Sequence, residues 1–362
     1  MKKGRLIIFH GVGQPLEMQN RNLRNVQKGE ILVRNIYTTI CGSDLHTYAG
    51  VRKEKCPTVL GHEIVGEIEM IESSHSHQDY QGRQLNIGDI ITWTIFASDP
   101  LSSNALDGMP QKGDNLFKYG HGLVDGNDDF HGGLGEYCFI KKGSCILKIP
   151  AALPLPIAAT INCAIATVAG AIRLAGNLKN KNIAIFGMGT LGVTCAAMCK
   201  DAGAAWVGAA DIEHKRIQDA LLFGADEAVN IKDEQTILAG KFNSNFFTKS
   251  IDVVFDMSGS PDAMENGLSM LAVGGVAVWV GAVFSSRKLQ IDAEVIIRNL
   301  LTIKGLHNYN YEDFNYALDF LNRNWQRYPF DRVVEKEFTL DTATEAFDYA
   351  LAHKPLRVGI KI

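Results

Sequence analysis

Short runs of β-branched and aromatic residues dominate the first 150 positions of the chain. Four of them have the length and composition of strands: Lys3–His10, Ile31–Tyr37, Ile64–Ile71 and Ile90–Phe96. Glycine and proline punctuate the segments between them, which is typical of turns. The pattern therefore predicts a first domain built mainly of β-strands.

The pattern changes after about residue 165, where strand-like runs alternate with helix-like segments. Asn182–Phe186 predicts a strand, Leu191–Ala202 a helix and Trp206–Ala210 a second strand. Further strands are expected at Ile251–Met257, Val276–Gly281 and Leu301–Gly305. Such alternation is typical of an α/β domain with a doubly wound parallel sheet.

The final segment is expected to return to the first domain. It predicts helices at Tyr311–Asn322 and Thr342–Ala352 and a closing strand at Val358–Ile362. A chain of 362 residues exceeds the usual size of one hydrophobic core. We therefore expect two domains, the first formed by residues 1–164 with 304–362 and the second by 165–303.

One uncharged run, Ile149–Ile172, is long enough to suggest a transmembrane helix. Three prolines break its first third, however, and Asn162 lies near its centre. We expect a buried helix and no membrane span.

Composition narrows the function classes. The net charge is −4 and the pI about 6.2, which gives no support for a nucleic-acid or anionic-membrane partner. The seven cysteines are scattered and do not form a disulfide framework. The apolar run after Lys2 and Lys3 is too short for a signal peptide, so a cytoplasmic location is expected.

Residues 41–63 contain the candidate chemistry. Cys41 and His62 supply a thiolate and an imidazole, which are ligands that Zn²⁺ prefers. Ser43 and His46 can pass a proton. Asp44 and Glu63 can orient the ligands through hydrogen bonds. A lone cysteine is more often a buried apolar residue, so this cluster gains weight only together with the motif that follows.

A glycine fingerprint follows the first strand of the second domain. Residues 187–192 read GMGTLG, with a strand before them and a helix after them, as dinucleotide binding requires. Gly189 lets the backbone approach a pyrophosphate at the helix N-terminus. Asp211 ends the next strand and can accept hydrogen bonds from ribose hydroxyls, which favours NAD over NADP. Lys215 and Arg216 leave a 2′-phosphate as the alternative.

Together these motifs resemble the zinc-dependent medium-chain alcohol dehydrogenases: CGSDLH at 41–46, GHEIVG at 61–66 and GMGTLG at 187–192. The likeness covers nearly the whole chain and keeps the family's motif order. Smaller signatures resemble the subgroup associated with phosphonate catabolism: PQK at 110–112, LFKYGH at 116–121, NCAIAT at 162–167, GLHNY at 305–309 and YPF at 328–330.

The resemblance implies a GroES-like catalytic domain and a Rossmann domain. It implies that Cys163 is the third ligand of a catalytic zinc that also binds Cys41 and His62. The cofactor residues carried over are Gly187, Gly189, Thr190, Leu191, Gly192 and Asp211. The implied reaction is hydride transfer between a small alcohol and NAD, with proton release through Ser43, the cofactor ribose and His46. Asp44 would orient His62, and Glu63 would lie behind the ligands.

A structural zinc is expected to be absent. In the family it binds four cysteines, and the corresponding positions here are Asp99, Ser102, Ala105 and Gly113. No thiol is present among them, and a closed zinc site needs four donors. One catalytic zinc per chain is therefore predicted. His75 and His77 offer only two further ligands, and we interpret their segment as a solvated loop.

Three points stay open at this stage. The alternatives to a zinc-dependent alcohol dehydrogenase are a zinc-free reductase of the same superfamily and a catalytically silent NAD-binding protein. Family members are dimers or tetramers, which predicts a homodimer or homotetramer joined along an edge strand near Val276–Val283. The cationic residues near the motifs could bind an anionic substrate or form a solvated surface: Arg52, Lys53, Lys55, Lys112, Lys118 and His121.

Overall fold

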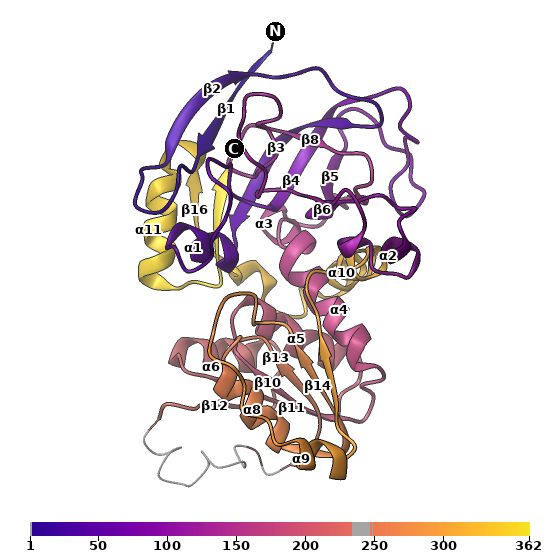
Figure 1. Cartoon of the computed structure of the whole chain (residues 1–362), viewed down its shortest axis with the longest axis vertical. Coiled ribbons are helices and arrows are strands. Elements are labelled where there is room, and N and C mark those ends of the chain that lie inside the picture. The colour runs from indigo at the N-terminus through magenta and orange to yellow at the C-terminus, as the bar shows by residue number, and fades with distance from the viewer. Residues whose placement is uncertain (1, 234–246, 248) are drawn as a thin grey trace. The chain divides into compact units, whose positions relative to one another are not determined.

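The computed structural model describes residues 2–233, 247 and 249–362, which fall into two compact units (Figure 1). Unit 1 comprises Met1–Ala166, Asn310–Trp325 and Phe330–Ile362. Unit 2 comprises Thr167–Tyr309 and Gln326–Pro329. The chain thus leaves unit 1 after Ala166 and returns to it at Asn310.

Unit 1 is built around a seven-stranded sheet in which β16, β17, β3, β4, β5 and β9 are neighbours in that order and β8 pairs with β3. The strands of unit 1 are β1 (Lys3–Ile8), β2 (Glu17–Asn22), β3 (Ile31–Ile40), β4 (Glu63–Ile71), β5 (Ile90–Trp93), β6 (Phe96–Ala97), β7 (Phe117–Lys118), β8 (Tyr137–Ile140), β9 (Ile146–Lys148), β16 (Val334–Thr339) and β17 (Arg357–Lys361). Strands β1 and β2 form a separate antiparallel pair, as do β6 and β7.

Short helices connect these strands. They are α1 (Gly42–Tyr48), α2 (Ser103–Leu106), η1 (Pro110–Lys112), α3 (Leu155–Ala158), η2 (Ile161–Ile165), α10 (Tyr311–Asn324), η3 (Phe330–Arg332), η4 (Leu340–Thr342) and α11 (Ala343–His353). Successive side chains of β3 enter different cores, because strand side chains alternate between the two faces. Ile31 and Val33 belong to the core that contains Trp93, whereas Leu32 belongs to the core that contains Phe139 and Phe347.

Unit 2 is a six-stranded parallel sheet with the order β12-β11-β10-β13-β14-β15. Its strands are β10 (Asn182–Phe186), β11 (Trp206–Asp211), β12 (Glu227–Asn230), β13 (Ile251–Asp256), β14 (Leu271–Trp279) and β15 (Thr302–Gly305). Its helices are α4 (Ala166–Ala175), α5 (Thr190–Asp201), α6 (His214–Leu222), α8 (Pro261–Ser269) and α9 (Ala293–Arg298). In chain order the strands run 3-2-1-4-5-6, the doubly wound order of a Rossmann sheet. The expected fold class, a GroES-like β-rich domain with a Rossmann domain, is confirmed.

One expectation about this sheet is wrong. Val276–Val283 was predicted to lie near the edge, yet β14 is hydrogen-bonded to β13 on one side and to β15 on the other. Among the described strands, β12 and β15 form the edges. Hydrophobicity marks a strand as buried but does not show which buried strand is last in the sheet.

A single helical stretch in the described residues, Leu155–Ala175, is long and apolar enough to cross a membrane by length and composition, with a mean hydropathy of 1.8. Of its most apolar window, 78% is buried inside the structure, as for the core helix of a globular protein. It contains most of the uncharged run described above.

Candidate metal centre

Two of the candidate ligands lie at the same end of the sheet because the strands that carry them are paired. Strand β3 ends directly before Cys41, and β4 begins directly after His62. The strands are antiparallel, with Thr39 opposite Glu63. The end of one strand therefore lies beside the start of the other.

The third ligand, Cys163, comes from a π-helical turn, Ile161–Ile165, a form that is often found at functional sites. Within this turn, Asn162 Nδ2 donates a hydrogen bond of 3.0 Å to the carbonyl oxygen of His62. The Sγ atoms of Cys41 and Cys163 are 3.9 Å apart, and ligand atoms of Cys41, His62 and Cys163 all lie within 4.8 Å of one another. Two sulfurs bound to one tetrahedral zinc are about 3.8 Å apart. These residues fit a zinc ion.

The two thiols differ in their readiness to ionise. A hydrogen bond from Cys163, with the positive charge of Arg357, holds the pKa of Cys41 well below its usual range although the group is buried. The same hydrogen bond and burial raise the pKa of Cys163 well above its usual range. The metal-free pair thus holds one proton, which a zinc ion bound by both sulfurs would displace.

Asp44 supports both His62 and the first turn of α1. Its Oδ1 lies 3.3 Å from His62 Nδ1 and accepts from the backbone N–H of Gly61 at 3.2 Å. Its Oδ2 accepts from the backbone N–H of Cys41 at 3.0 Å. The contact assigns the Nδ1 proton to the Asp44 side of the ring and leaves Nε2 as the metal-binding atom.

Ser43 and His46 share one face of α1, three residues apart. Ser43 Oγ lies 3.4 Å from His62 Nε2, the atom that would bind the metal. The hydroxyl is therefore close enough to contact a substrate bound to that metal. Burial lowers the pKa of His46, and the nearby charge of Arg52 lowers it further. His46 is therefore held in its neutral form, which can accept a proton from a neighbouring group.

A buried ion pair behind the ligands was not predicted from the sequence. Arg357 donates from Nε to Glu63 Oε2 at 2.7 Å and from Nη2 to Glu63 Oε1 at 2.9 Å. The same Nη2 lies 3.5 Å from Cys41 Sγ. Thr39 Oγ1 also donates to Glu63, at 2.5 Å. Glu63 is thereby held away from the ligand set, and the single positive charge of Arg357 faces both the carboxylate and the Cys41 sulfur.

Strand pairing alone explains how Arg357 reaches this position. It opens β17, in which the next residue, Val358, lies opposite Ile40 of β3. A solitary arginine before an apolar strand carries no sequence signal of such a role.

A second imidazole lies against His62. The ring of His121 stacks on that of His62 with 5.5 Å between centroids, and its Nδ1 lies 2.6 Å from Glu54 Oε2. Gly120 makes this approach possible, because a Cβ there would lie 2.6 Å from the carbonyl oxygen of Gly61. Its φ of +76° also favours glycine.

Positive charge is concentrated beside this histidine pair. Arg52 lies 3.1 Å from Glu54, which is shared with His121. Lys118 is half-buried and has no ion-pair partner among the residues that the structure describes. Burial lowers the pKa of Lys118, as do the charges of Lys112 and Arg52. Lys53 and Lys55, by contrast, are exposed.

The glycine fingerprint lies in unit 2, where its three glycines have different surroundings. A Cβ on Gly187 would lie 2.7 Å from the backbone nitrogen of Ser258, and one on Gly192 would lie 2.0 Å from the Gly187 carbonyl oxygen. A Cβ on Gly189 would meet nothing within 4 Å. Gly189 caps α5, whose first residues are Thr190 and Leu191, so this open space adjoins the helix N-terminus.

Asp211 ends β11 and is tied to the fingerprint. Its Oδ2 accepts from the backbone N–H of Met188 at 2.5 Å, and its Oδ1 accepts from Ile212 and Glu213. The Nη1 atom of Arg216 is 3.7 Å from the same carboxylate. The carboxylate is fixed in place at the end of the strand.

The segment with the four thiol-free positions is folded without any cysteine. Ser102 Oγ donates to the Asp99 carbonyl oxygen at 2.8 Å, and Ser98 Oγ donates to that of Pro110 at 2.7 Å. A Cβ on Gly113 would lie 2.8 Å from Ser102 Oγ. Hydrogen bonds thus hold these turns together. The number of zinc ions per chain is not tested by this geometry, and one zinc per chain stays a prediction.

Two family profiles match the chain. Residues 27–151 match "Alcohol dehydrogenase GroES-like domain", and residues 190–323 match "Zinc-binding dehydrogenase". Alcohol dehydrogenase 2 of Solanum lycopersicum is 27% identical over 374 residues, covering 95% of this chain and 93% of that protein.

Solved structures share the fold. An alcohol dehydrogenase from Thermotoga maritima superposes with a TM-score of 0.90 at 21% identity, covering 100% of both chains. A zinc-binding dehydrogenase from Sinorhizobium meliloti 1021, bound to NADP, gives a TM-score of 0.85 at 20% identity with the same coverage.

Proposed function

The chain belongs to the zinc-type medium-chain alcohol dehydrogenase superfamily, and from that premise we propose that it is a zinc-dependent, NAD-linked dehydrogenase of a small alcohol or aldehyde. The observation that carries the proposal is the convergence of Cys41, His62 and Cys163 within 4.8 Å. Three protein ligands leave one coordination position for a substrate, as a catalytic zinc site requires.

A bound zinc ion supplies Lewis acidity, which lowers the pKa of a bound hydroxyl group. The residues of the chain orient and balance the site. Asp44 fixes the ring of His62, and Arg357 pairs with Glu63 and lies beside the Cys41 sulfur. Ser43 is the group that would accept the substrate proton, and His46 would pass it to solvent.

The cofactor is expected to be NAD. NAD supplies the hydride acceptor. Asp211 carries a negative charge where the adenosine ribose is bound in a Rossmann domain, and a 2′-phosphate would be repelled by it. Arg216 lies 3.7 Å from that carboxylate, so its charge is partly balanced by Asp211 and is less available to a phosphate.

The substrate is expected to carry an anionic end, such as a phosphonate. Lys118 is half-buried and forms no direct ion pair in the described part of the chain, and Glu54, the acid near it, is already paired with Arg52 and His121. A desolvated cation is costly unless it is paired, and an anionic substrate would supply the partner. The subgroup resemblance in the sequence leads to the same substrate class.

The test combines metal analysis with turnover. We expect about one zinc per chain and NAD-dependent oxidation of a phosphonate-bearing alcohol. Lys118→Ala should raise the KM for that alcohol about tenfold and change the KM for a neutral alcohol little, whereas the exposed Lys53→Ala should affect neither. Turnover without zinc would favour the zinc-free reductase. Zinc and NAD binding without turnover of any alcohol would favour the silent protein.

We also propose a homodimer or homotetramer. Among the described strands, β15 pairs only with β14, so one side of it is free for another copy. Light scattering of the purified protein would test this, and a monomer at micromolar concentration would exclude it.

A further inference from the structure

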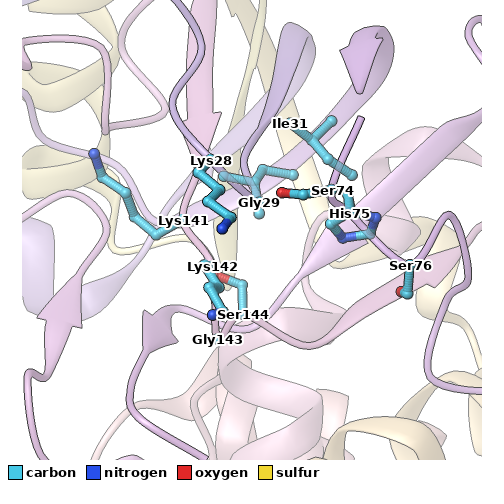
Figure 2. Close-up of a pocket in the computed structure, with 11 residues that line it drawn as sticks. Lys28, Gly29, Ile31, Ser74, His75, Ser76, Lys141, Lys142, Gly143 and Ser144 are labelled. Carbon is cyan, nitrogen blue, oxygen red and sulfur yellow. The ribbon is translucent and has the colours of Figure 1, made fainter. Parts of the chain in front are cut away.

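A pocket of about 390 Å³ lies at one end of the large sheet of unit 1 (Figure 2). Three turns form its walls: residues 28–29 before β3, residues 74–76 after β4 and residues 141–144 after β8. These turns meet because Ile31 pairs with Ile71 on one side and with Ile140 on the other. Ile31 and Ile140 lie behind these turns, and their side chains are buried in the core of the sheet.

The pocket is separate from the metal centre. Strand β3 runs from the pocket at Ile31 to Ile40, next to the ligand Cys41. Strand β4 runs back from Glu63 to Ile71. A strand of this length spans about 30 Å. A ligand in the pocket therefore cannot touch the metal ligands.

Two lysines give the pocket an excess of positive charge. Lys28 and Lys142 are exposed and have no ion-pair partner in the part of the chain that the structure describes. The aliphatic stem of Lys142 lies over Gly29, where a Cβ would be 3.3 Å from it. The neighbouring Lys141 differs, since its ammonium pairs with Glu30 and Asp128 and its side chain extends away from the other lining residues (Figure 2).

The nearest carboxylates are already bound to other donors. Glu72 accepts hydrogen bonds from the backbone N–H groups of Gly29 and Ser74 and from the hydroxyls of Ser73 and Ser74. Glu30 accepts from Arg24 and Lys141. Glu30 is neutralised by its own cationic partners, whereas the donors to Glu72 are uncharged and leave its negative charge in place. Lys28 and Lys142 therefore give the pocket a net positive charge against the single charge of Glu72.

Two side chains add neutral donors. His75 Nδ1 accepts from the backbone N–H of His77 at 3.0 Å, so the neutral ring carries its proton on Nε2. Burial lowers the pKa of His75, which favours the neutral form. Tyr119 OH accepts from the backbone N–H of Lys141 at 2.7 Å and lies 2.7 Å from Ser144 Oγ. When the buried Tyr119 hydroxyl donates to Ser144 Oγ, the proton of Ser144 is free to point elsewhere.

We propose that this pocket binds a small phosphate monoester. Two ammonium groups, an imidazole N–H and a serine hydroxyl match the several acceptor oxygens and double charge of a phosphate group. The volume lies in the range of small-molecule sites and exceeds what a bare phosphate would fill. The proposal does not depend on the dehydrogenase activity.

The test is calorimetric titration of the zinc-loaded protein with ribose 5-phosphate, inorganic phosphate and ribose. We expect ribose 5-phosphate to bind more tightly than phosphate, and ribose not to bind. The double variant Lys28→Ala/Lys142→Ala should weaken binding of ribose 5-phosphate by about tenfold or more. The matched control Lys3→Ala/Lys288→Ala removes the same charge from two exposed lysines elsewhere and should bind as the wild type does.

Three results would overturn the proposal. One is a wild type that does not bind ribose 5-phosphate. Another is equal affinity in the pocket variant and the control. The third is loss of binding in Lys118→Ala with retention in Lys28→Ala/Lys142→Ala, which would place the phosphate at the metal centre. Failure of the dehydrogenase assay leaves the titration unaffected, so the two proposals fail separately. Both pocket lysines are exposed, so their removal should leave the fold intact.

Discussion

Replacing Arg357 with methionine should destabilise unit 1 strongly. The guanidinium is buried, makes two hydrogen bonds to the Glu63 carboxylate and lies 3.5 Å from Cys41 Sγ. Methionine fills much of the same volume but leaves the buried carboxylate without a counter-ion. Removing one partner of a buried ion pair costs about 3–5 kcal/mol of unfolding free energy.

A double-mutant cycle separates this cost from lost packing. Glu63→Gln/Arg357→Met removes both charges, and replacing a buried pair as a whole is often close to neutral. The double variant should therefore be more stable than Arg357→Met alone by about 2 kcal/mol or more.

The assay is urea unfolding of the zinc-loaded variants, followed by far-UV circular dichroism and checked for zinc content. Arg357→Lys is a useful companion, since it keeps the charge but loses the bidentate geometry and should fall between the wild type and Arg357→Met. The single variant Glu63→Gln completes the cycle. If the costs in unfolding free energy of Glu63→Gln and Arg357→Met simply add up in the double variant, the two charges do not interact, and the account of an ion pair is refuted. A cost below about 1 kcal/mol for Arg357→Met would refute it as well.

Three further predictions follow from the same structure. Elemental analysis should find about one zinc per chain and its loss in Cys163→Ser, whereas two tightly bound zinc ions would contradict the thiol-free lobe. Wild-type turnover should be faster with NAD than with NADP at equal concentration, and Asp211→Ala should weaken NAD more than NADP. Burial lowers the pKa of His131 to about 4. Because the unfolded state binds the extra proton, stability should fall as the pH drops from about 6.5 to about 4, by about 1.4 kcal/mol per pH unit at most, and His131→Phe should flatten that decline in acid-denaturation curves.

The sequence was most informative where function and local structure share one segment. Cys41 and His62 each adjoin a predicted strand, and a hairpin-like pairing of those strands is enough to bring them together. The fingerprint at 187–192 likewise lies between the strand and the helix that its chemistry needs. Cys163 needed the resemblance, because a thiol in an apolar segment has no local mark and its π-helical turn cannot be read from composition.

What the sequence could not show depends on long-range pairing. Arg357 becomes part of the metal centre only because β17 pairs with β3. The order of strands in the parallel sheet was also hidden, which explains the wrong edge at Val276–Val283. Lys141 and Lys142 are adjacent and identical in type, yet Lys141 is paired with acids and Lys142 has no ion-pair partner among the described residues. The two lysines differ because the fold places the Lys141 side chain beside Glu30 and Asp128, acids that are distant from it in the sequence.

The pairing of Arg357 with Glu63 and Cys41 has a consequence for biosynthesis. The partners are separated by 294 and 316 residues, so a nascent chain displays Cys41 and Glu63 long before their counter-ion has been made. Contacts this distant in sequence form late, because closing the intervening loop costs entropy. We expect the thiolate and the carboxylate to stay hydrated until β17 joins the sheet. Stable loading with metal is then an event that follows synthesis of that strand, and ribosome-bound chains that stop before Arg357 should exchange zinc freely.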